Sequence, residues 1–348
     1  MKNSIWGDFI NGKFEGNGKF INDDDYYIGH FKNGLRNGKG IVYYSNGNIE
    51  FEGEFINNKR ERYGKYIWED GEYYIGQFKN HLAHGKGIEN YSNGKIIYEG
   101  EFINWKRGGY GKYIWEDGEY YIGQWRNDLK HGKATYYYSN GNIQYEGEYF
   151  NNKREGHGKY IDEEGKYYVI GEFQNGWLNG KGTVYNSANG KILYEGDFID
   201  DKFEGNGKLN YENGNYYLGQ FKNHLMNGKG IEYYSNGNIQ YEGDFINDQR
   251  EGDGKYFYEN GDYYIGKYKN GKPLKGKIYS SNGKIVLYDG DFINGKLPNG
   301  IKIFPFNDGE YYVGQCKDGL FHGKGIIYNS NGTIKQKGNW INDKFVGN

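Results

Sequence analysis

Aromatic residues and glycines alternate with polar residues along this chain in a way that predicts short β-hairpins. Tyr217, Gly219 and Phe221 stand two residues apart, so an extended strand places them on one face. Gly230 belongs to the strand that returns, and the polar residues 223–227 are typical of the hairpin loop between the two strands. Helical periodicity and helix caps are absent from the sequence. We therefore expect strands and turns throughout.

The same arrangement recurs from one end of the chain to the other. Taking the glycine between the two aromatic residues as the anchor, the sequence contains 15 units spaced 22 to 25 residues apart, and two unit types alternate. The anchors are Gly7, Gly29, Gly53, Gly76, Gly100, Gly123, Gly147, Gly171, Gly196, Gly219, Gly243, Gly266, Gly290, Gly314 and Gly338. A fixed period of this length indicates a repeat array in which each unit contacts mainly its neighbours.

The fold prediction follows from that period. We expect an all-β, elongated, twisted single-layer antiparallel array of β-hairpins. It would cover residues 1–348 as a single array of 14–15 repeats without a second domain. Asn-Gly and Asp-Gly pairs, such as Asn46-Gly47 and Asp70-Gly71, separate runs of Tyr, Ile and Phe and are strong hairpin signals.

Two segments interrupt the pattern. Residues 167–171 contain one extra residue and place Val169 in the aromatic position, which predicts a β-bulge in this strand. All three prolines fall within 273–305, and the units around 264–305 are degenerate. This second segment is interpreted either as decayed repeats with longer loops or as a bend or docking site.

The aromatic face is the first candidate binding surface. A glycine flanked by aromatic residues leaves a notch that a ring of the adjacent strand can cover, so the rings stabilise the sheet. Exposed rows of rings would also offer rigid contact area to a helix or an extended peptide. Either the structural role alone or both roles together fit the pattern. The candidate residues are Tyr74, Phe78, Tyr98, Phe102, Tyr121, Trp125, Tyr145, Tyr149, Tyr217, Phe221, Tyr241 and Phe245.

The loops within units form the second candidate surface. In a meander these loops share one edge of the sheet, and cations gather there, so this edge could contact the headgroups of an anionic membrane. Neighbouring Asp and Glu would offset much of that attraction. The candidate residues are Lys59, Arg60, Lys106, Arg107, Lys153, Arg154 and Arg250.

Composition excludes several classes of function. The net charge is −2 and the pI is near 6.4, so no overall field attracts nucleic acid. Gly-Lys-Gly at 85–87 is followed by no helix, which argues against a phosphate-binding loop. We find no catalytic constellation, and we expect neither a metal nor a cofactor.

Location and self-association are predicted from the two ends and the cysteine content. The single Cys316 and a start without an apolar run predict an intracellular, cytoplasmic protein. It would be neither secreted nor anchored by a transmembrane segment, though contact with a membrane or the cytoskeleton is compatible with the sequence. The terminal strands lack a polar cap, so we expect self-association through them.

The pattern Tyr-x-Gly-x-Phe followed by Gly-x-Gly, as at 74–87 and 217–230, resembles the MORN (membrane occupation and recognition nexus) repeat. The resemblance covers nearly the whole chain and implies stacked hairpins in a single sheet. It also implies a scaffold or binding module, of the kind found in cytoskeletal and junctional structures or beside enzyme domains such as lipid kinases. Phospholipid binding has been proposed for this family. Without a companion domain the resemblance implies no enzymatic activity, and we expect a scaffold that binds a protein or peptide segment.

Overall fold

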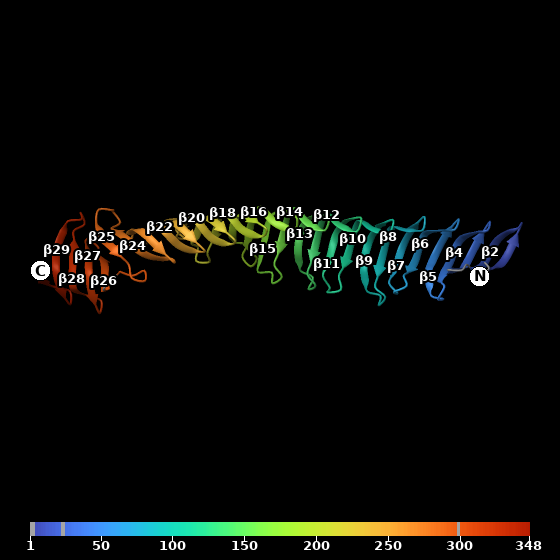
Figure 1. Ribbon diagram of the computed structural model, residues 1–348, viewed down its shortest axis with the longest axis horizontal. Coiled ribbons are helices and arrows are strands. Elements are labelled where there is room, and N and C mark those ends of the chain that lie inside the picture. The colour runs from blue at the N-terminus through green and yellow to red at the C-terminus, as the bar shows by residue number, and fades with distance from the viewer. Residues whose placement is uncertain (1–3, 22–24, 298–299) are drawn as a thin grey trace. The chain divides into compact units, whose positions relative to one another are not determined.

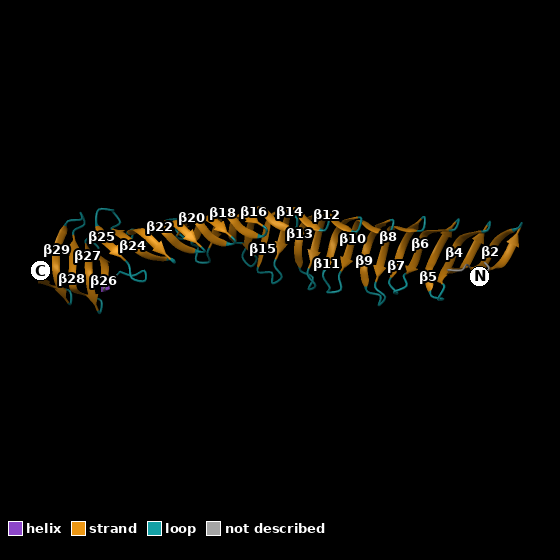
Figure 2. Cartoon of the chain, viewed as in Figure 1, coloured by secondary structure: helices purple, strands orange, loops and turns teal. Residues whose placement is uncertain are grey.

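The computed structural model describes residues 4–21, 25–297 and 300–348, and no α-helix occurs in these ranges. The chain divides into two compact units, Met1–Trp177 and Leu178–Asn348. Strands joined by short loops make up both units (Figures 1 and 2). The prediction of an all-β array of antiparallel hairpins is confirmed.

In the first unit, strands that are consecutive in the chain pair with each other in antiparallel fashion. The strands are β1 (Ser4–Ile10), β2 (Lys13–Ile21), β3 (Asp25–Lys32), β4 (Leu35–Tyr44), β5 (Ile49–Ile56), β6 (Lys59–Ile67), β7 (Tyr73–Lys79), β8 (Leu82–Asn90), β9 (Ile96–Ile103), β10 (Lys106–Ile114), β11 (Tyr120–Arg126), β12 (Leu129–Tyr137), β13 (Ile143–Phe150), β14 (Lys153–Ile161) and β15 (Tyr167–Gln174).

The second unit contains ten strands that continue this pattern and a separate five-stranded sheet. The first ten are β16 (Trp177–Asn186), β17 (Ile192–Ile199), β18 (Lys202–Asn210), β19 (Tyr216–Lys222), β20 (Leu225–Tyr233), β21 (Ile239–Ile246), β22 (Gln249–Phe257), β23 (Tyr263–Lys269), β24 (Lys272–Tyr279) and β25 (Val286–Asp291). The separate sheet consists of β26 (Ile301–Pro305), β27 (Tyr311–Lys317), β28 (Leu320–Tyr328), β29 (Ile334–Ile341) and β30 (Lys344–Gly347).

A row of glycines crosses the strands at the centre of each sheet. In β6 to β9, Gly64 pairs with Gly76, Gly76 with Gly87, and Gly87 with Gly100. Only Ala134 interrupts the row between β3 and β14, where it pairs with a glycine on either side. The register therefore aligns every repeat on its anchor glycine.

The loops within units are shorter than expected. We predicted a loop over 223–227, but β19 ends at Lys222 and β20 begins at Leu225, so that prediction is wrong. The turn consists of Asn223 and His224, both with positive φ (49° and 69°), as in a type I′ turn. An asparagine or aspartate begins each of these two-residue turns, and these residues tolerate the left-handed conformation better than most.

The Asn-Gly and Asp-Gly turns lie between units and do join strands into hairpins. Most of them form three-residue loops in which only the glycine has a positive φ, as with Gly47 at 89°, whereas the turns at Asn189-Gly190 and Asn282-Gly283 are one residue longer. The Gly47 N–H donates to the Tyr44 carbonyl, and the Tyr44 N–H donates to the Asn48 carbonyl. The sequence signal was therefore right about the hairpin but does not produce a type I′ turn here.

The predicted bulge in residues 167–171 is not found against β14. Here β15 pairs without a register shift, Gly158 with Gly171 and Tyr160 with Val169. The additional residue lies in the preceding turn, which runs from Asp162 to Tyr167. A longer turn absorbs the insertion at lower cost than a disrupted ladder.

The proline-containing segment coincides with a break in the hydrogen-bonded ladder. β25 pairs with β24, and β26 pairs with β27, but within the described residues no ladder joins β25 to β26. Pro298 lies outside the described residues. The degenerate units thus mark the end of one sheet and the start of another.

Candidate interaction surfaces

The aromatic rings of the predicted binding face form the interior of the repeats. Edge-to-face contacts run continuously from one repeat to the next. Tyr74 contacts Phe78 and Phe102, with ring centroids 5.3 and 4.9 Å apart, and Tyr98 contacts Phe102 and Trp125 at 5.1 and 5.6 Å. Such pairs stabilise a protein beyond the area that they bury. The rings therefore supply the packing that a single hairpin lacks.

A tyrosine that precedes an anchor glycine by two residues also covers the glycine row. A Cβ atom on Gly87 would stand closer than 3.0 Å to the Tyr74 ring. The Tyr74 hydroxyl donates a hydrogen bond to the Gln77 carbonyl at 2.9 Å, and Tyr217 bonds Gln220 in the same way at 3.0 Å. The buried polar end of each ring is thereby satisfied.

All twelve predicted partner-binding residues are buried, with exposed fractions between 0 and 6%. Our premise that this face presents exposed rings is wrong, because the rings cover one another and the glycines. That a partner binds these twelve residues remains a prediction, but their side chains offer a partner almost no surface.

Trp105 belongs to the aromatic cluster and was missed in the sequence analysis. It occupies the second position of a two-residue turn, with φ of 68°, where other repeats have Gly, Asn, Asp or His. Its ring lies 5.6 Å from Tyr74, 5.7 Å from Phe78 and 5.3 Å from Tyr66. The signal was a tryptophan in a turn position, where only a tertiary contact compensates for the strain.

The arginines of the loop edge lie over the aromatic rings. The Arg107 guanidinium lies 4.6 Å from the centroid of Tyr113 and donates to Glu89 at 2.8 Å. Arg250 lies 4.7 Å from Tyr241 and donates to Glu232 at 2.7 Å. The other two are engaged in the same manner: Arg60 pairs with Glu50, and Arg154 donates to the Gly176 carbonyl at 3.0 Å.

Of the seven predicted headgroup contacts, only the lysines are therefore exposed. They are Lys59, Lys106 and Lys153. Binding of an anionic membrane remains a prediction, and it rests on these three side chains.

The opposite face of the sheet, which we call the back face, carries a groove along the glycine row in the first unit. Its floor is glycine backbone, because the neighbouring side chains stand on either side of the row. Two adjoining hollows of about 600 and 490 Å³ share Tyr63 and Ile75 in their walls. The groove therefore runs across the strands from β3 to β11.

One wall of the groove alternates apolar and charged pairs. From β4 to β11 the register places these side chains next to one another in the order Ile41, Glu52, Lys65, Ile75, Ile88, Glu99, Lys112 and Ile122. We call this series the back-face row. The other wall contains Tyr63 and Tyr110, which are 58% and 59% exposed. Large exposed aromatic side chains are typical of interaction surfaces.

Comparison with known families agrees with this repeat geometry. The MORN repeat model matches residues 7–24, 27–49, 51–73, 74–96, 98–120, 121–143, 145–167, 170–187, 194–216, 217–239, 241–263 and 312–334, which is more than half of the chain. The chain belongs to the MORN repeat family. No curated protein matches it.

Two solved structures are similar to the chain at low TM-scores. One is a mutant of the TCP10 domain of Danio rerio CPAP, with 10% identity, a TM-score of 0.23, and coverage of 73% of this chain and 95% of that one. The other is a protein of unknown function from Bacteroides caccae, with 13% identity, a TM-score of 0.15, and coverage of 91% and 93%.

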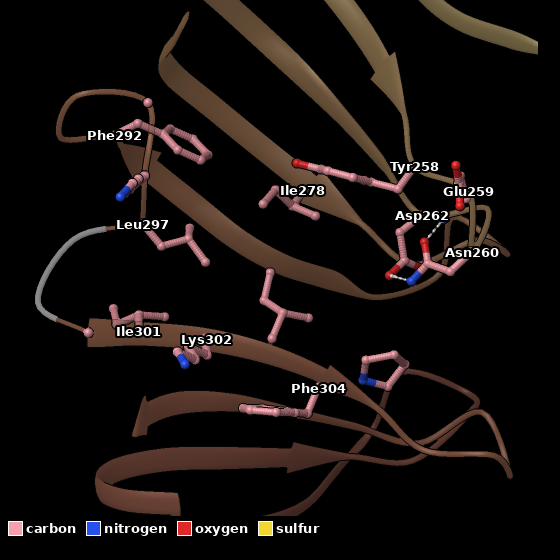
Figure 3. A pocket seen from close by; sticks show the side chains of 15 residues that line it. Tyr258, Glu259, Asn260, Asp262, Ile278, Phe292, Leu297, Ile301, Lys302 and Phe304 are labelled. Carbon is pink, nitrogen blue, oxygen red and sulfur yellow. Dashed lines mark hydrogen bonds between the residues drawn. The ribbon is translucent and has the colours of Figure 1, made fainter. Parts of the chain in front are cut away.

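The MORN matches leave out residues 264–311, where the second unit contains a pocket of about 770 Å³. Ile278, Phe292, Leu297, Ile301 and Phe304 make its lining mainly apolar (Figure 3). The pocket lies where the ladder breaks between β25 and β26. It is therefore a gap between the two sheets of this unit, at the degenerate repeats.

Asp262, at the polar end of that pocket, has hydrogen bonds to both of its carboxylate oxygens. Asp262 is buried and accepts bonds from the Tyr311 hydroxyl at 2.7 Å, the Ser281 N–H at 2.8 Å and the Asn260 side-chain amide at 2.9 Å. Tyr311 belongs to the five-stranded sheet, so these bonds connect the two sheets of this unit. The carboxylate acts as a structural link, with both of its oxygens engaged by groups of the chain itself.

Neither a metal site nor a membrane-spanning helix is found in the part of the MORN chain that the structure describes. Within the described ranges, no three His, Cys, Asp or Glu side chains are placed to hold a metal ion. In the same ranges no helix is long and apolar enough to cross a membrane.

Proposed function

We propose that this MORN protein is a non-enzymatic scaffold that binds protein through the back-face groove. MORN repeats typically serve as interaction modules, which supports the scaffold class. The observation that carries the proposal is the contrast between the two faces. The rings of the aromatic face are buried against one another. Tyr63 and Tyr110 are instead exposed, beside a groove whose floor is backbone.

The partner is expected to bind the back face of the sheet and not the aromatic face predicted from the sequence. A partner gains affinity from rigid aromatic side chains that it can cover, and fully buried rings cannot contribute in this way. The isoleucines of the groove add apolar area, and the glutamates and lysines add orientation.

The test compares two tyrosine variants in a pull-down. The groove variant carries Tyr63→Ser and Tyr110→Ser. The control carries Tyr167→Ser, which removes a 45% exposed tyrosine outside both hollows of the groove. Immobilised full-length chains are exposed to a cell extract, and the retained proteins are quantified by mass spectrometry.

We expect the groove variant to lose most of the proteins that the wild type retains, while the control keeps them. Circular dichroism must be the same for all three chains. Equal retention by the groove variant and the wild type would contradict the proposed surface, and retention no greater than that of bare resin would contradict the scaffold function.

A further inference from the structure

The back-face row repeats the order apolar, apolar, acidic, basic with a period of four strands. Ile75 and Ile88 are neighbours in register, followed by Glu99 and Lys112. The same order precedes them when Ile28 of β3, which pairs with Ile41, is added before the row: Ile28, Ile41, Glu52 and Lys65. At about 4.8 Å per strand, one period covers roughly 19 Å. The side chains belong to different strands, so this order is invisible as a continuous motif in the sequence.

In the part of the chain that the structure describes, the acidic members of the row have no partner. The Glu52 and Glu99 side chains make no ion pair and no hydrogen bond there, although Lys65 and Lys112 face them in register. The lysines instead lie over tyrosine rings, Lys65 over Tyr73 at 4.1 Å and Lys112 over Tyr120 at 4.4 Å. The row therefore presents unpaired carboxylates between apolar pairs.

The row is complementary in charge and in apolar character to an identical row that runs in the opposite direction. If two identical rows face each other in opposite directions, with a two-fold axis between β7 and β8, Ile75 meets Ile88 of the other copy. Lys65 then meets Glu99, Glu52 meets Lys112, and Ile41 meets Ile122. Two rows facing in the same direction place either like charges or a charge and an isoleucine opposite each other at some position in every register.

The other wall of the groove is compatible with the same arrangement. An axis parallel to the strands keeps each wall opposite its own counterpart, so Tyr63 comes opposite Glu101 of the other copy and can donate to its carboxylate. An axis along the row would instead place Glu52 opposite Glu54 and Glu99 opposite Glu101, which like-charge repulsion disfavours.

We infer that the partner of the groove in the first unit is a second copy of this chain, bound antiparallel about an axis between β7 and β8. This inference rests on the proposed function, because it names a partner for the same surface. Closed two-fold contacts are the commonest form of self-association, and in them each contact between two different residues occurs twice. The two hollows, which together extend from β3 to β11, are nearly centred on this axis.

The experiment uses charge exchange in the purified full-length chain, with the mass measured by analytical ultracentrifugation. Single variants Lys65→Glu and Glu99→Lys each place like charges opposite each other twice per dimer. The double variant Lys65→Glu/Glu99→Lys restores opposite charges. Glu116→Lys, in an exposed turn outside the groove, is the matched control.

We expect the wild type and the control to form a dimer of twice 40.4 kDa. Each single variant should raise the dissociation constant about tenfold or more, and the double variant should return it to within about threefold of the wild type. Because the pairs are electrostatic, the difference between single and double variants should shrink with added salt.

A monomeric wild type at every accessible concentration would overturn the inference, as would a dimer that neither single variant weakens. A double variant as weak as the single ones, with unchanged circular dichroism, would overturn the antiparallel register. A chain that stays monomeric yet retains other proteins through Tyr63 and Tyr110 would overturn the inference and leave the proposed function standing.

Discussion

At the scale of single residues, the glycine row is a steric requirement of the tyrosine beside it. The Tyr74 ring lies over Gly76 and Gly87 so closely that a Cβ atom on either would overlap it. Ala134 is the exception within the row, and its Cβ would collide with one on Gly123. One methyl group can therefore be accommodated where the facing position remains glycine, but only if the ring moves.

Gly87→Ala should lower the free energy of unfolding by about 2 kcal/mol, because the methyl group overpacks the site and displaces Tyr74. The control Gly141→Ala has open space around its Cβ and should cost about 1 kcal/mol, through its positive φ of 86° alone. Denaturant titration of both variants measures the difference. Equal losses would show that the ring does not depend on this glycine.

Lys130 is a lysine at a position where several other repeats have an arginine. It occupies the position that holds Arg107 or Arg154 in other repeats, and its amine lies 4.9 Å from the centroids of both Trp115 and Tyr136. Burial lowers the pKa of Lys130 from 10.5 to about 8, while nearby Glu119 acts in the opposite direction. Arginine stays charged at this position, whereas the lysine can lose its proton.

The lowered pKa predicts a pH-dependent contribution to stability. Between pH 8 and 10.5 the unfolded chain holds more protons at Lys130 than the folded chain, so this group's contribution to the unfolding free energy rises with pH. Below pH 8 the buried Lys130 amine is charged in the folded chain, and it lowers the unfolding free energy by its full amount. The stability difference between the wild type and Lys130→Met should therefore shift in favour of the wild type from pH 8 to 10.

Both chains contain the same tyrosines, which ionise in the unfolded state at high pH. Subtracting the two unfolding free energies at each pH therefore cancels the contribution of tyrosine ionisation. Lys130→Arg provides a second control, since its charge does not change in this window and its contribution should stay level. A difference in unfolding free energy between the wild type and Lys130→Met that does not change with pH would contradict the lowered pKa.

At the scale of the hairpin, turn side chains link each repeat to the one before it. The Asp128 carboxylate accepts a hydrogen bond from the Arg107 N–H at 2.8 Å, and the Asp128 N–H donates to the Arg107 carbonyl at 3.1 Å. Asn152 and Asp248 make the same side-chain bond to Lys130 and Met226. The Asn and Asp in these turns thus both permit the turn and connect neighbouring hairpins.

Asp128→Gly should lower the unfolding free energy by about 1 kcal/mol, the usual value of one such hydrogen bond. Glycine keeps the positive φ without strain but lacks the acceptor. Asp128→Asn retains an acceptor and should remain within about 0.3 kcal/mol of the wild type in thermal unfolding. If both substitutions cost the same, the link between hairpins does not depend on the side-chain oxygen.

The sequence allowed the hairpins and their order to be predicted because strand alternation and turn residues are local signals. The exact turns were mispredicted because Asn223 and His224 adopt the left-handed conformation without a glycine. The extra residue before Val169 was placed in the strand, although a turn accommodates it without breaking hydrogen bonds. Trp105 could be placed only once its distant ring contacts were known.

At the scale of the whole molecule, the aromatic face was correctly identified but its accessibility was not. Residue spacing shows which side chains share a face, but it does not show how far the rings of successive repeats cover one another. Burial of Tyr74 and its counterparts depends on contacts between repeats, such as the one with Phe102. The back-face groove could not be predicted either, because its row joins residues of eight different strands.

The most direct test is residue-resolved chemical labelling of tyrosine in the full-length chain, free and bound to its protein partners. In the free chain, at concentrations where it is monomeric, we predict modification of Tyr63 and Tyr110 and protection of Tyr74 and Tyr98. Binding should protect Tyr63 and Tyr110 and leave the exposed control Tyr167 reactive. Labelling of Tyr74 and Tyr98 in the free chain, or unchanged labelling of Tyr63 and Tyr110 on binding, would contradict the assignment of the back face as the interaction surface.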